Sequence, residues 1–451
     1  MKSINRNTMR NWRKAFSILL LAVGLFACLQ SFAPAKIERS KVIKKDFDAK
    51  PEVSASHQYG PLTIKKSTDG RIHLEAEMLL TGSDEASIEE VLGRFDVAVK
   101  ESENELRLET DLGIEGCNTI NNRMTIKYKD GHKVKGIGDM TVKMTLWVPN
   151  PGKLKLDNKY DRIELADDYN GELRVMLYSG DFVAANLGGS LDLDLKYGKA
   201  KMGNVEKAKL NIYDSKVNMG NLSQARVDSK YSEFVLGNVS GDMKLQTYDE
   251  KWQVGNVGGK LTLDDKYSEF KFEDIGEVEM SVFDADFVME NVGKMEILDT
   301  KYSKYKLENI ALLKISSSFD DDFKIKAAEH AGTGDSKYSE YHIGHISKNF
   351  SIGQSFDDMV VLEEVAANFE HIGFDGKYTE MTLNIAEGGQ FKFSINMKYG
   401  KANYPGGKVT VLKEIEKDGQ TIIEGYVGAE PNELTVNKLS ISGFDNTLNW
   451  R

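Results

Sequence analysis

The chain is poor in cysteine and proline, and both shortages limit how it can be built. It has two cysteines in 451 residues, and Cys28 lies in an N-terminal apolar segment, so loss of that segment leaves Cys117 alone. No internal disulfide is then possible, and a hydrophobic core must hold the fold. The seven prolines lie mostly outside the central part of the chain, where a sheet needs its N–H donors.

The sequence also lacks the motifs of familiar catalytic and metal sites. No nucleophile elbow, zincin helix or phosphate-binding loop is present. Gly258-Gly259-Lys260 lacks the upstream glycine of a phosphate loop, so we interpret it as a turn. His342 and His345 lie three positions apart, and such positions on a strand face opposite sides, which disfavours a transition-metal site. We therefore expect no catalytic residue, no metal ion and no cofactor.

Acidic residues outnumber basic ones, and the imbalance is larger in the body of the chain. The formal net charge is −11, and the first 35 residues carry five basic side chains and no acidic one. Without that segment the net charge is −16. Such a chain is repelled by nucleic acid and by an anionic membrane surface, so neither is an expected partner. The charge fits a soluble envelope protein, or one that meets cations.

Residues 1–35 predict an export signal. A basic stretch precedes Ala15–Cys28, an apolar run of 14 residues that is short for a membrane span. Ala33-Pro34-Ala35 offers small residues for cleavage. Two alternatives stay open, because Leu25-Phe26-Ala27-Cys28 approximates a lipoprotein box and the segment could also remain as an uncleaved anchor. Only with a lipid on Cys28 or with that anchor would a membrane hold the chain.

The centre of the chain repeats a turn sequence with a fixed period. An Asn or Asp, followed by an aliphatic residue, recurs every 17 or 18 positions. These turn positions are Asn186, Asn204, Asn221, Asn238, Asn256, Asp274, Asn291 and Asn309. A period this short, with no helical pattern inside it, is typical of a stacked solenoid.

A second repeat of twice that length runs over the first. Lys-Tyr pairs recur about every 35 residues, and pairs of an aromatic residue and Asp fall between them. The Lys-Tyr pairs are Lys196-Tyr197, Lys230-Tyr231, Lys266-Tyr267, Lys301-Tyr302 and Lys337-Tyr338. The intervening pairs are Tyr213-Asp214, Tyr248-Asp249, Phe283-Asp284 and Phe319-Asp320. Two types of coil therefore alternate along the chain.

Apolar and polar residues alternate within each coil, as Leu261 and Leu263 illustrate. Alternation at period two predicts short strands with one buried face, and parallel stacking at about 4.8 Å joins these faces into one core. Stacking also places each turn Asn above the next. Their amides could form an inward hydrogen-bonded ladder, or these residues could serve only as turn formers that tolerate a left-handed backbone.

These patterns predict an all-β fold, a single-stranded parallel β-helix or β-solenoid of about 14 coils of 17–18 residues. We expect an export signal at 1–35, a linker or first strand at 36–57, a β-rich part with one helix at 58–150, solenoid repeats at 151–407 and a C-terminal cap at 408–451.

Three local signals lie outside the repeats. Helical spacing of apolar residues predicts one helix over Ser83–Phe95. Ser67-Thr68-Asp69-Gly70, between two short apolar runs, predicts a hairpin in the N-terminal part, most of which we expect to form wide coils. Lys417-Asp418-Gly419 predicts a second, antiparallel hairpin that caps the open end of the solenoid.

Two stretches carry a resemblance to a known family. Trp147-Val148-Pro149, followed by serial short strands with Gly, Asp and Asn turns, resembles the bacterial putative-adhesin β-solenoid family, as does Tyr59-Gly60-Pro61-Leu62-Thr63-Ile64. The resemblance covers roughly residues 40–430, and the Tyr59–Ile64 motif is similar to members from Bacteroidetes-like bacteria. It implies an exported β-helical protein of the periplasm, outer membrane or surface of a Gram-negative bacterium, and it supplies no catalytic residue. The Lys-Tyr pairs depart from it, since many relatives have a turn glycine there.

The Lys-Tyr columns are the strongest candidate for a binding surface. Like residues two coils apart would lie about 9.6 Å from each other on one side of the solenoid, where tyrosines can stack on sugar rings. The structural interpretation is that the rings pack as a ladder over the core and the lysines are solvated. Acidic clusters such as Asp320-Asp321-Asp322 and Asp264-Asp265 could hold Ca²⁺, although turn preference also explains them.

The sequence therefore favours an exported, non-enzymatic envelope or surface protein with an adhesin-like binding or scaffolding role. Its ligand would come from the envelope, a glycan or an extracellular matrix. The alternative is a carbohydrate-active β-helix enzyme, a polysaccharide lyase or hydrolase, because aromatic and acidic columns would suit that chemistry. Tight coils with short loops leave little room for a catalytic cleft, which favours the first hypothesis.

Overall fold

The computed structural model describes residues 36–110, 112–121, 123–430 and 437–451, and the fold is nearly all β, with 72% strand and 2% helix. The predicted export signal and Cys28 lie outside the described residues. The chain forms two compact units, and the division falls within β1 (Ile37–Phe47), β4 (Ile72–Gly82) and β9 (Lys133–Val148). None of the helical segments in the described ranges has the length and apolar character needed to span a bilayer.

The described residues of the smaller unit are 36–42, Glu77–Asp96, 112–121 and 123–142. In it, β7 (Ile114–Ile120) and β8 (Arg123–Tyr128) pair antiparallel, and β8 pairs antiparallel with the first part of β9. The expectation that the N-terminal strands form mostly wide coils is wrong here. Only short loops connect these strands, and such loops allow antiparallel but not parallel pairing.

The same unit holds α2 (Glu85–Arg94), which confirms the helix predicted over Ser83–Phe95. The side chain of Asp84 accepts a hydrogen bond from the backbone N–H of Ser87 at 3.0 Å and so caps the first turn. The buried positions of the helix are Ile88, Val91 and Leu92. Their spacing of three and four residues is that of a single apolar stripe.

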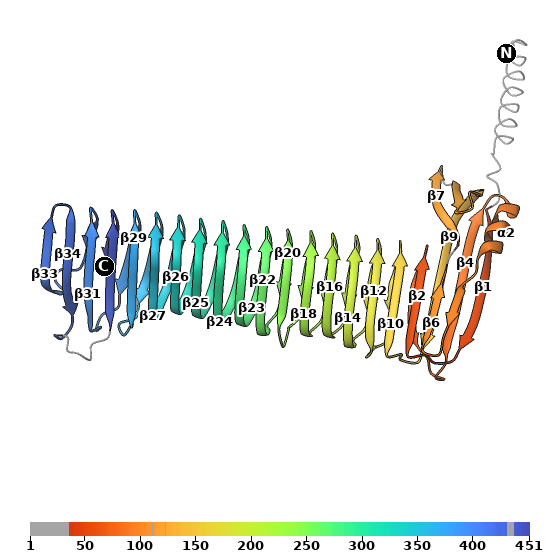
Figure 1. The fold of residues 1–451 in the computed structure, drawn as a ribbon, viewed down its shortest axis with the longest axis horizontal. Coiled ribbons are helices and arrows are strands. Elements are labelled where there is room, and N and C mark those ends of the chain that lie inside the picture. The colour runs from red at the N-terminus through yellow and green to blue at the C-terminus, as the bar shows by residue number, and fades with distance from the viewer. Residues whose placement is uncertain (1–35, 111, 122, 431–436) are drawn as a thin grey trace, which may run out of the picture. The chain divides into compact units, whose positions relative to one another are not determined.

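The larger unit, Ile43–Ala76, Val97–Thr110 and Lys143–Arg451, is a β-solenoid of about 13 turns, which confirms the predicted fold class. Successive coils stack in parallel, and Figure 1 shows their strands as a row of arrows that point the same way. One coil consists of a long strand such as β16 (Val205–Tyr213), a sharp corner, a short strand such as β17 (Lys216–Met219), and a turn.

The strands of the first coils alternate in length. The long ones are β10 (Lys153–Lys159), β12 (Glu172–Tyr178), β14 (Leu187–Lys196), β16, β18 (Leu222–Lys230), β20 (Met243–Tyr248) and β22 (Val257–Lys266). The short ones are β11 (Ile163–Leu165), β13 (Asp181–Ala184), β15 (Lys199–Met202), β17, β19 (Glu233–Leu236) and β21 (Lys251–Val254). In the next coils the strand continues through the turn, as β23 (Glu269–Phe283), β24 (Asp286–Lys301), β25 (Lys304–Phe319), β26 (Asp322–Lys337) and β27 (Glu340–Phe356).

The last part of the chain contains β28 (Met359–Val365), β29 (His371–Lys377), β30 (Glu380–Ile385), β31 (Phe391–Lys398), β32 (Lys401–Asn403), β33 (Thr410–Lys417), β34 (Gln420–Val427), β35 (Lys438–Phe444) and β36 (Thr447–Trp450). The first part of the solenoid contains β2 (Glu52–Gln58), β3 (Leu62–Lys66), β5 (Ala98–Glu101) and β6 (Glu105–Glu109).

In the stacked coils between β10 and β31, alternate residues of the strands fill the interior. Leu210 and Ile212 of β16 and Val217 and Met219 of β17 are at most 3% exposed. In the parallel register Leu210 lies beside Val227 of the next coil. Each row of apolar side chains therefore continues from coil to coil, and one long core forms that no single coil could bury.

Aromatic rings form a column inside this core, on the short-strand side. The rings are those of Phe234, Trp252, Phe270, Phe287, Tyr305, Phe323 and Tyr341, and each is at most 3% exposed. Neighbouring rings are nearly parallel, at 2–16°, with centroids 3.8–6.4 Å apart. This inner stack fixes the coils in register through close packing.

The order of coils in space differs from their order in sequence at both ends. The coil of β2 and β3 lies between the coil of β10 and β11 and the strands β6 and β9. At the other end β35 lies between β29 and β31, and β36 between β30 and β32, so the final strands are inserted between two earlier coils. Neither insertion is visible in the period of the sequence.

The two predicted hairpins have different outcomes. β33 and β34 pair antiparallel, and β34 pairs antiparallel with β31, so the C-terminal hairpin cap is confirmed. The hairpin predicted around Ser67–Gly70 is wrong, because β3 pairs in parallel with both β9 and β11. Because both edges of β3 are paired, β4 cannot form a hairpin with it.

Candidate functional site

The Lys-Tyr pairs lie at the corner between the long and the short strand of a coil. The backbone of Tyr231 at this corner has a φ of 60°, and in the next coil Asp249 takes the place with a φ of 56°. A left-handed backbone suits Asp and Asn and is unusual for a bulky residue. Tyrosine has it at Tyr59, Tyr160, Tyr197, Tyr231, Tyr267, Tyr302, Tyr338, Tyr378 and Tyr399.

The parallel register places unlike residues above one another. Lys230 lies beside Tyr213 in the preceding coil and beside Tyr248 in the following one. The corner position alternates between Tyr and Asp in the same rhythm. From Lys196 to Tyr378, each coil therefore presents one aromatic ring and one charge, and their order is reversed in the next coil.

The rings of successive coils touch and form one continuous row, which we call the outer ladder. In spatial order it contains Tyr59, Tyr160, Tyr178, Tyr197, Tyr213, Tyr231, Tyr248, Tyr267, Phe283, Tyr302, Phe319, Tyr338, Phe356, Tyr378, Phe444 and Tyr399. Centroids of neighbouring rings are 5.3–6.1 Å apart. Beyond the first contact the rings meet edge to face at 75–88°, the favourable geometry for aromatic pairs.

The outer ladder is open to solvent. Its corner tyrosines from Tyr160 to Tyr399 are 43–57% exposed. Partial desolvation, and then the neighbouring tyrosines, raise the pKa of Tyr197 and of Tyr231. The ladder thus leaves nearly half of each corner ring available for contact with another molecule.

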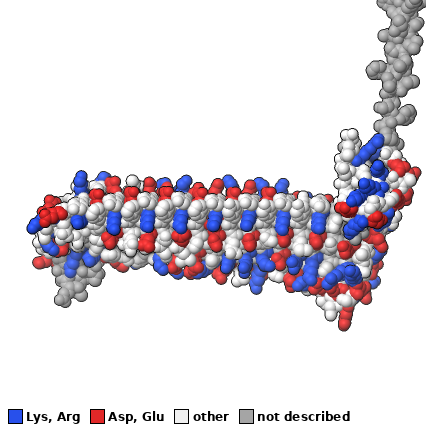
Figure 2. Space-filling view, turned by 45° about the horizontal axis from the view of Figure 1, so that its top comes forward, with Lys and Arg blue, Asp and Glu red and all other residues white. Residues whose placement is uncertain are grey.

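Charges of both signs flank the outer ladder at regular intervals (Figure 2). Most of them form no ion pair with any described residue: Lys196, Lys230, Lys266, Lys337 and Lys377 among the lysines, and Asp214, Asp249, Asp284, Asp320 and Asp357 at the corners. Lys301 is an exception, since its Nζ lies 3.3 Å from Asp299. One lysine and one aspartate in every two coils make the net charge of this surface close to zero.

A buried polar column supports the corners from inside. It consists of Ser215, Ser232, Glu250, Ser268, Ser303, Asp321, Ser339, Asp358, Thr379 and Asn446. The N–H of Asp321 donates to Ser339 Oγ at 3.2 Å, and the N–H of Ser339 donates to Asp358 Oδ1 at 2.8 Å. These bonds satisfy backbone donors that the sharp corner withdraws from the strand ladder.

Several acids in or beside this column are buried, and burial raises the pKa of each. The pKa of Glu250 rises to about 8, although the hydroxyl of Ser229 donates to it at 2.7 Å. Burial also raises the pKa of Asp265, Asp321 and Asp358, against the hydrogen bonds that they accept. Since these acids lie in the interior, their role is in the fold.

The turn residues form a hydrogen-bonded row of their own, the turn ladder. Asn238 Oδ1 accepts from the backbone N–H of Asn256 at 3.0 Å, and equivalent bonds join Asn186, Asn204, Asn221 and Asn238. A glycine precedes Asn204, Asn221, Asn238 and Asn256 and leaves room for this oxygen: a Cβ on Gly255 would lie 2.3 Å from Asn238 Oδ1. Further along, Asn291 Nδ2 donates to Asp274 Oδ1 at 2.6 Å and Asn309 Nδ2 to Asn291 Oδ1 at 2.8 Å.

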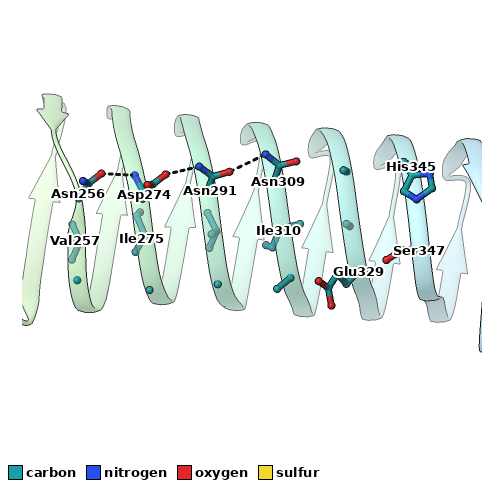
Figure 3. A pocket seen from close by; sticks show the side chains of 17 residues that line it. Asn256, Val257, Asp274, Ile275, Asn291, Asn309, Ile310, Glu329, His345 and Ser347 are labelled. Carbon is teal, nitrogen blue, oxygen red and sulfur yellow. Dashed lines mark hydrogen bonds between the residues drawn. The ribbon is translucent and has the colours of Figure 1, made fainter.

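The turn ladder faces solvent and not the core. It borders a groove of about 660 Å³, and small residues such as Gly258, Gly276 and Gly293 are among those that line it. Figure 3 shows Asn256, Asn291 and Asn309 along this groove. Glu329 and His345 lie toward one end of it. The groove follows the turns over several coils.

The acidic clusters and histidines of the sequence do not converge. Asp264 is exposed and Asp265 is buried, because neighbouring residues of a strand point to opposite sides. His342 Nε2 lies 2.6 Å from Glu363, whereas His345 Nδ1 lies 3.6 Å from Glu364. In the described ranges no group of three or more His, Cys, Asp or Glu side chains could hold a metal ion.

One charged pocket lies away from the outer ladder, on the outer face of β2, β6, β10 and β12. It has a volume of about 420 Å³, and its charged lining residues are Glu105, Arg107, Glu109, Lys155, Asp157 and Arg174. Burial raises the pKa of Asp157, and nearby Glu109 adds to the rise. Sequence reasoning missed this pocket because the stacking of β6 on β2 is not encoded in the repeat.

Sequence reasoning also missed the full extent of the outer ladder. Lys159-Tyr160, Lys377-Tyr378 and Lys398-Tyr399 repeat the Lys-Tyr pattern and could have been included on that signal. The joining of Lys-Tyr coils with aromatic-Asp coils into a single row depends on the register of neighbouring coils, which pairs Lys230 with Tyr248 and brings the Tyr231 ring against the Tyr248 ring. Only the structure shows that register.

The fold and the surface define a parallel β-solenoid with an aromatic and charged edge. No family model matches the chain, and no curated protein resembles it in sequence. Among solved structures it is similar to a putative cell adhesion protein from Clostridium sporogenes, at 8% identity and a TM-score of 0.17, over 91% of this chain and 99% of that one.

Two further neighbours are putative adhesins. The one from Parabacteroides merdae has 10% identity and a TM-score of 0.28, over 64% of this chain and 96% of that one. The one from Bacteroides fragilis has 15% identity and a TM-score of 0.21, over 63% and 96%. At these TM-scores the likenesses say nothing about what this chain binds.

Proposed function

We propose that this chain is an exported, non-enzymatic protein of the bacterial envelope or surface, and that its solenoid is a rigid rod for adhesin-like binding or scaffolding. The outer ladder carries this proposal. It is a solvent-exposed row of rings that runs along the solenoid, whereas isolated proteins rarely expose large continuous apolar patches without a partner.

The architecture supports a binding role. Backbone ladders join the coils, the inner stack packs the coils from Phe234 to Tyr341, and the buried polar column supports the corners from Ser215 onward. The corner side chains are therefore held at fixed spacing, and little conformational entropy is lost when a ligand contacts them. A rigid repetitive edge suits a repetitive or extended ligand better than a small molecule.

The N-terminal segment and the charge support export. The apolar run at Ala15–Cys28 behind a basic stretch has the composition of a signal, and the remaining chain is strongly acidic. Cleavage would release the solenoid into the periplasm or beyond, while a lipid on Cys28 would hold it at a membrane.

A carbohydrate-active enzyme is the second candidate, and the charged pocket is the observation that favours it. Asp157, with its raised pKa, lies with Glu109 and Arg174 in a pocket that a polymer could reach. If Asp157 acts in catalysis there, the purified chain should cleave a polysaccharide, and an Asp157→Asn variant should not.

One experiment separates these functions. Cells producing the full chain are fractionated and treated with external protease, and the purified chain is applied to glycan and matrix-protein arrays and to a panel of polysaccharides with and without Ca²⁺. The proposal predicts an envelope or surface location, binding to at least one array component and no cleavage. A cytoplasmic location, or cleavage that depends on Asp157, would contradict it.

A further inference from the structure

The geometry of the outer ladder restricts the ligand that it can accept. It offers one ring for every coil, and rings of the same corner type recur every second coil. The coil spacing of a parallel sheet is about 4.8 Å. An extended chain of six-membered sugar rings advances by a similar length for each sugar, so successive sugars can lie over successive coils.

Backbone strain indicates that the tyrosine rings themselves matter. The corner requires a left-handed backbone, which Gly, Asn and Asp adopt at lower cost than Tyr. The intervening coils do have Asp there, as at Asp249 and Asp284. The recurrence of tyrosine at a strained backbone position therefore indicates that its ring has a role beyond forming the turn.

The flanking charges restrict the ligand further. Lys230 and Lys266 offer donors on one side of the rings, and Asp249 and Asp284 offer acceptors on the other. None of these four forms an ion pair with a described residue. Because the two signs balance, a polyanion or a polycation gains little net attraction. A chain of hydroxyl groups, which both donate and accept, can use both kinds of group.

We propose that the outer ladder binds an extended, uncharged glycan that lies along the solenoid axis. This inference rests on the proposed binding function and names its ligand class. The electron-rich faces of the rings attract the C–H faces of the sugars, and the lysines and aspartates bond to the hydroxyls. A pocket of about 600 Å³ borders the ladder, and polar side chains such as Lys301, Lys337 and Gln354 line it, so it offers further hydrogen-bonding groups to hydroxyls.

The test compares three forms of the full chain. The first is the natural sequence, and the second has Tyr231→Asn, Tyr267→Asn and Tyr302→Asn, which remove three exposed rings but keep residues suited to the left-handed corner. The third has Tyr→Phe at the same positions and keeps the rings. Circular dichroism and thermal unfolding establish that all three are folded.

Binding is measured by affinity electrophoresis and calorimetry. The probes are soluble neutral β-1,4-glucan and β-1,4-mannan, their oligosaccharides of three to six sugars, helical α-1,4-glucan and anionic polygalacturonate. We expect binding to at least one extended neutral glycan that tightens with oligosaccharide length. The Asn variant should bind about tenfold or more weakly, and the Phe variant within about threefold of the natural chain.

Other outcomes would overturn the inference. They are the absence of binding to every neutral glycan, equal binding by the Asn variant, preference for polygalacturonate, and self-association of the chain through the ladder. If the arrays reveal a matrix-protein ligand that the Asn variant no longer binds, the glycan assignment fails while the proposed binding function stands. Failure of export, in contrast, would remove the proposed function itself.

Discussion

The ring of Tyr231 lies 5.6 Å from the ring of Tyr248 in the next coil, and the two planes meet at 77°. Tyr231 belongs to a Lys-Tyr corner and Tyr248 to an aromatic-Asp corner, so this contact joins the two coil types. Repeated along the solenoid, it produces one exposed row of rings from two interleaved sequence patterns. The row stabilises the corners and also presents a surface.

The inner stack predicts a large stabilising role for Phe287, whose ring lies 5.0 Å from Phe270 and 5.2 Å from Tyr305. Phe287→Ala should lower the free energy of unfolding by about 3–5 kcal/mol, because it leaves a cavity between two stacked rings. Phe287→Leu should cost clearly less, since it refills most of the volume. Guanidinium denaturation followed by circular dichroism measures both, and equal small losses would contradict the packing role.

The buried acids predict that stability falls as pH rises. The pKa of Glu250 is about 8 in the folded chain and near 4.5 when unfolded, so the folded state binds more protons between these values. The unfolding free energy therefore decreases with rising pH across that window. Raised pKa values at Asp265, Asp321 and Asp358 act in the same direction.

The control for this pH effect is Glu250→Gln, which keeps an acceptor for Ser229 and cannot ionise. Melting temperatures between pH 5 and pH 8 should decline less in the variant than in the natural chain. An identical decline would show that Glu250 does not carry the effect.

The turn ladder predicts a modest role for each amide. Asn238→Ala removes the acceptor of the Asn256 N–H and should cost about 1 kcal/mol, because exposed hydrogen bonds contribute modestly. Asn238→Asp keeps an acceptor oxygen and should cost less. Denaturation midpoints distinguish the two, and a larger loss in the Asp variant would contradict the assigned geometry.

The corner conformation predicts which substitutions are tolerated at Asp284. Its φ is 54°, so Asp284→Asn should be nearly neutral. Asp284→Val should cost about 1–2 kcal/mol, since a β-branched side chain is strained in the left-handed region. The same denaturation assay applies, and tolerance of Val would indicate that the corner relaxes.

Much of the solenoid could be predicted from the sequence because its causes are local. The alternation of Leu261 and Leu263 gives strands, and the recurrence of Asn at the turns gives the coil length. The serines that follow most Lys-Tyr corners, such as Ser232 and Ser268, also recur and could have indicated the buried polar column. Because serine is small and lies next to charged residues in the sequence, the pattern did not indicate that these side chains are buried.

Other features could not be predicted because the repeat period of the sequence does not specify which distant strands pair. The turn residues at Ser67–Gly70 predict a hairpin between β3 and β4. In the structure, however, both edges of β3 are already paired, one with β9 and the other with β11. The insertion of β35 between β29 and β31 likewise depends on edges that come together only in the folded chain. The bonds from the turn N–H groups to the side chains of the preceding coil likewise form only when the coils stack.

The most direct test of the central claim is tyrosine-selective chemical labelling, read by mass spectrometry, with and without a bound glycan. We predict that bound ligand protects Tyr231, Tyr267 and Tyr302 of the outer ladder and leaves Tyr404 of the C-terminal region unchanged. Equal labelling of the ladder tyrosines in the free and ligand-bound chain would show that the ligand binds elsewhere, and would contradict the account.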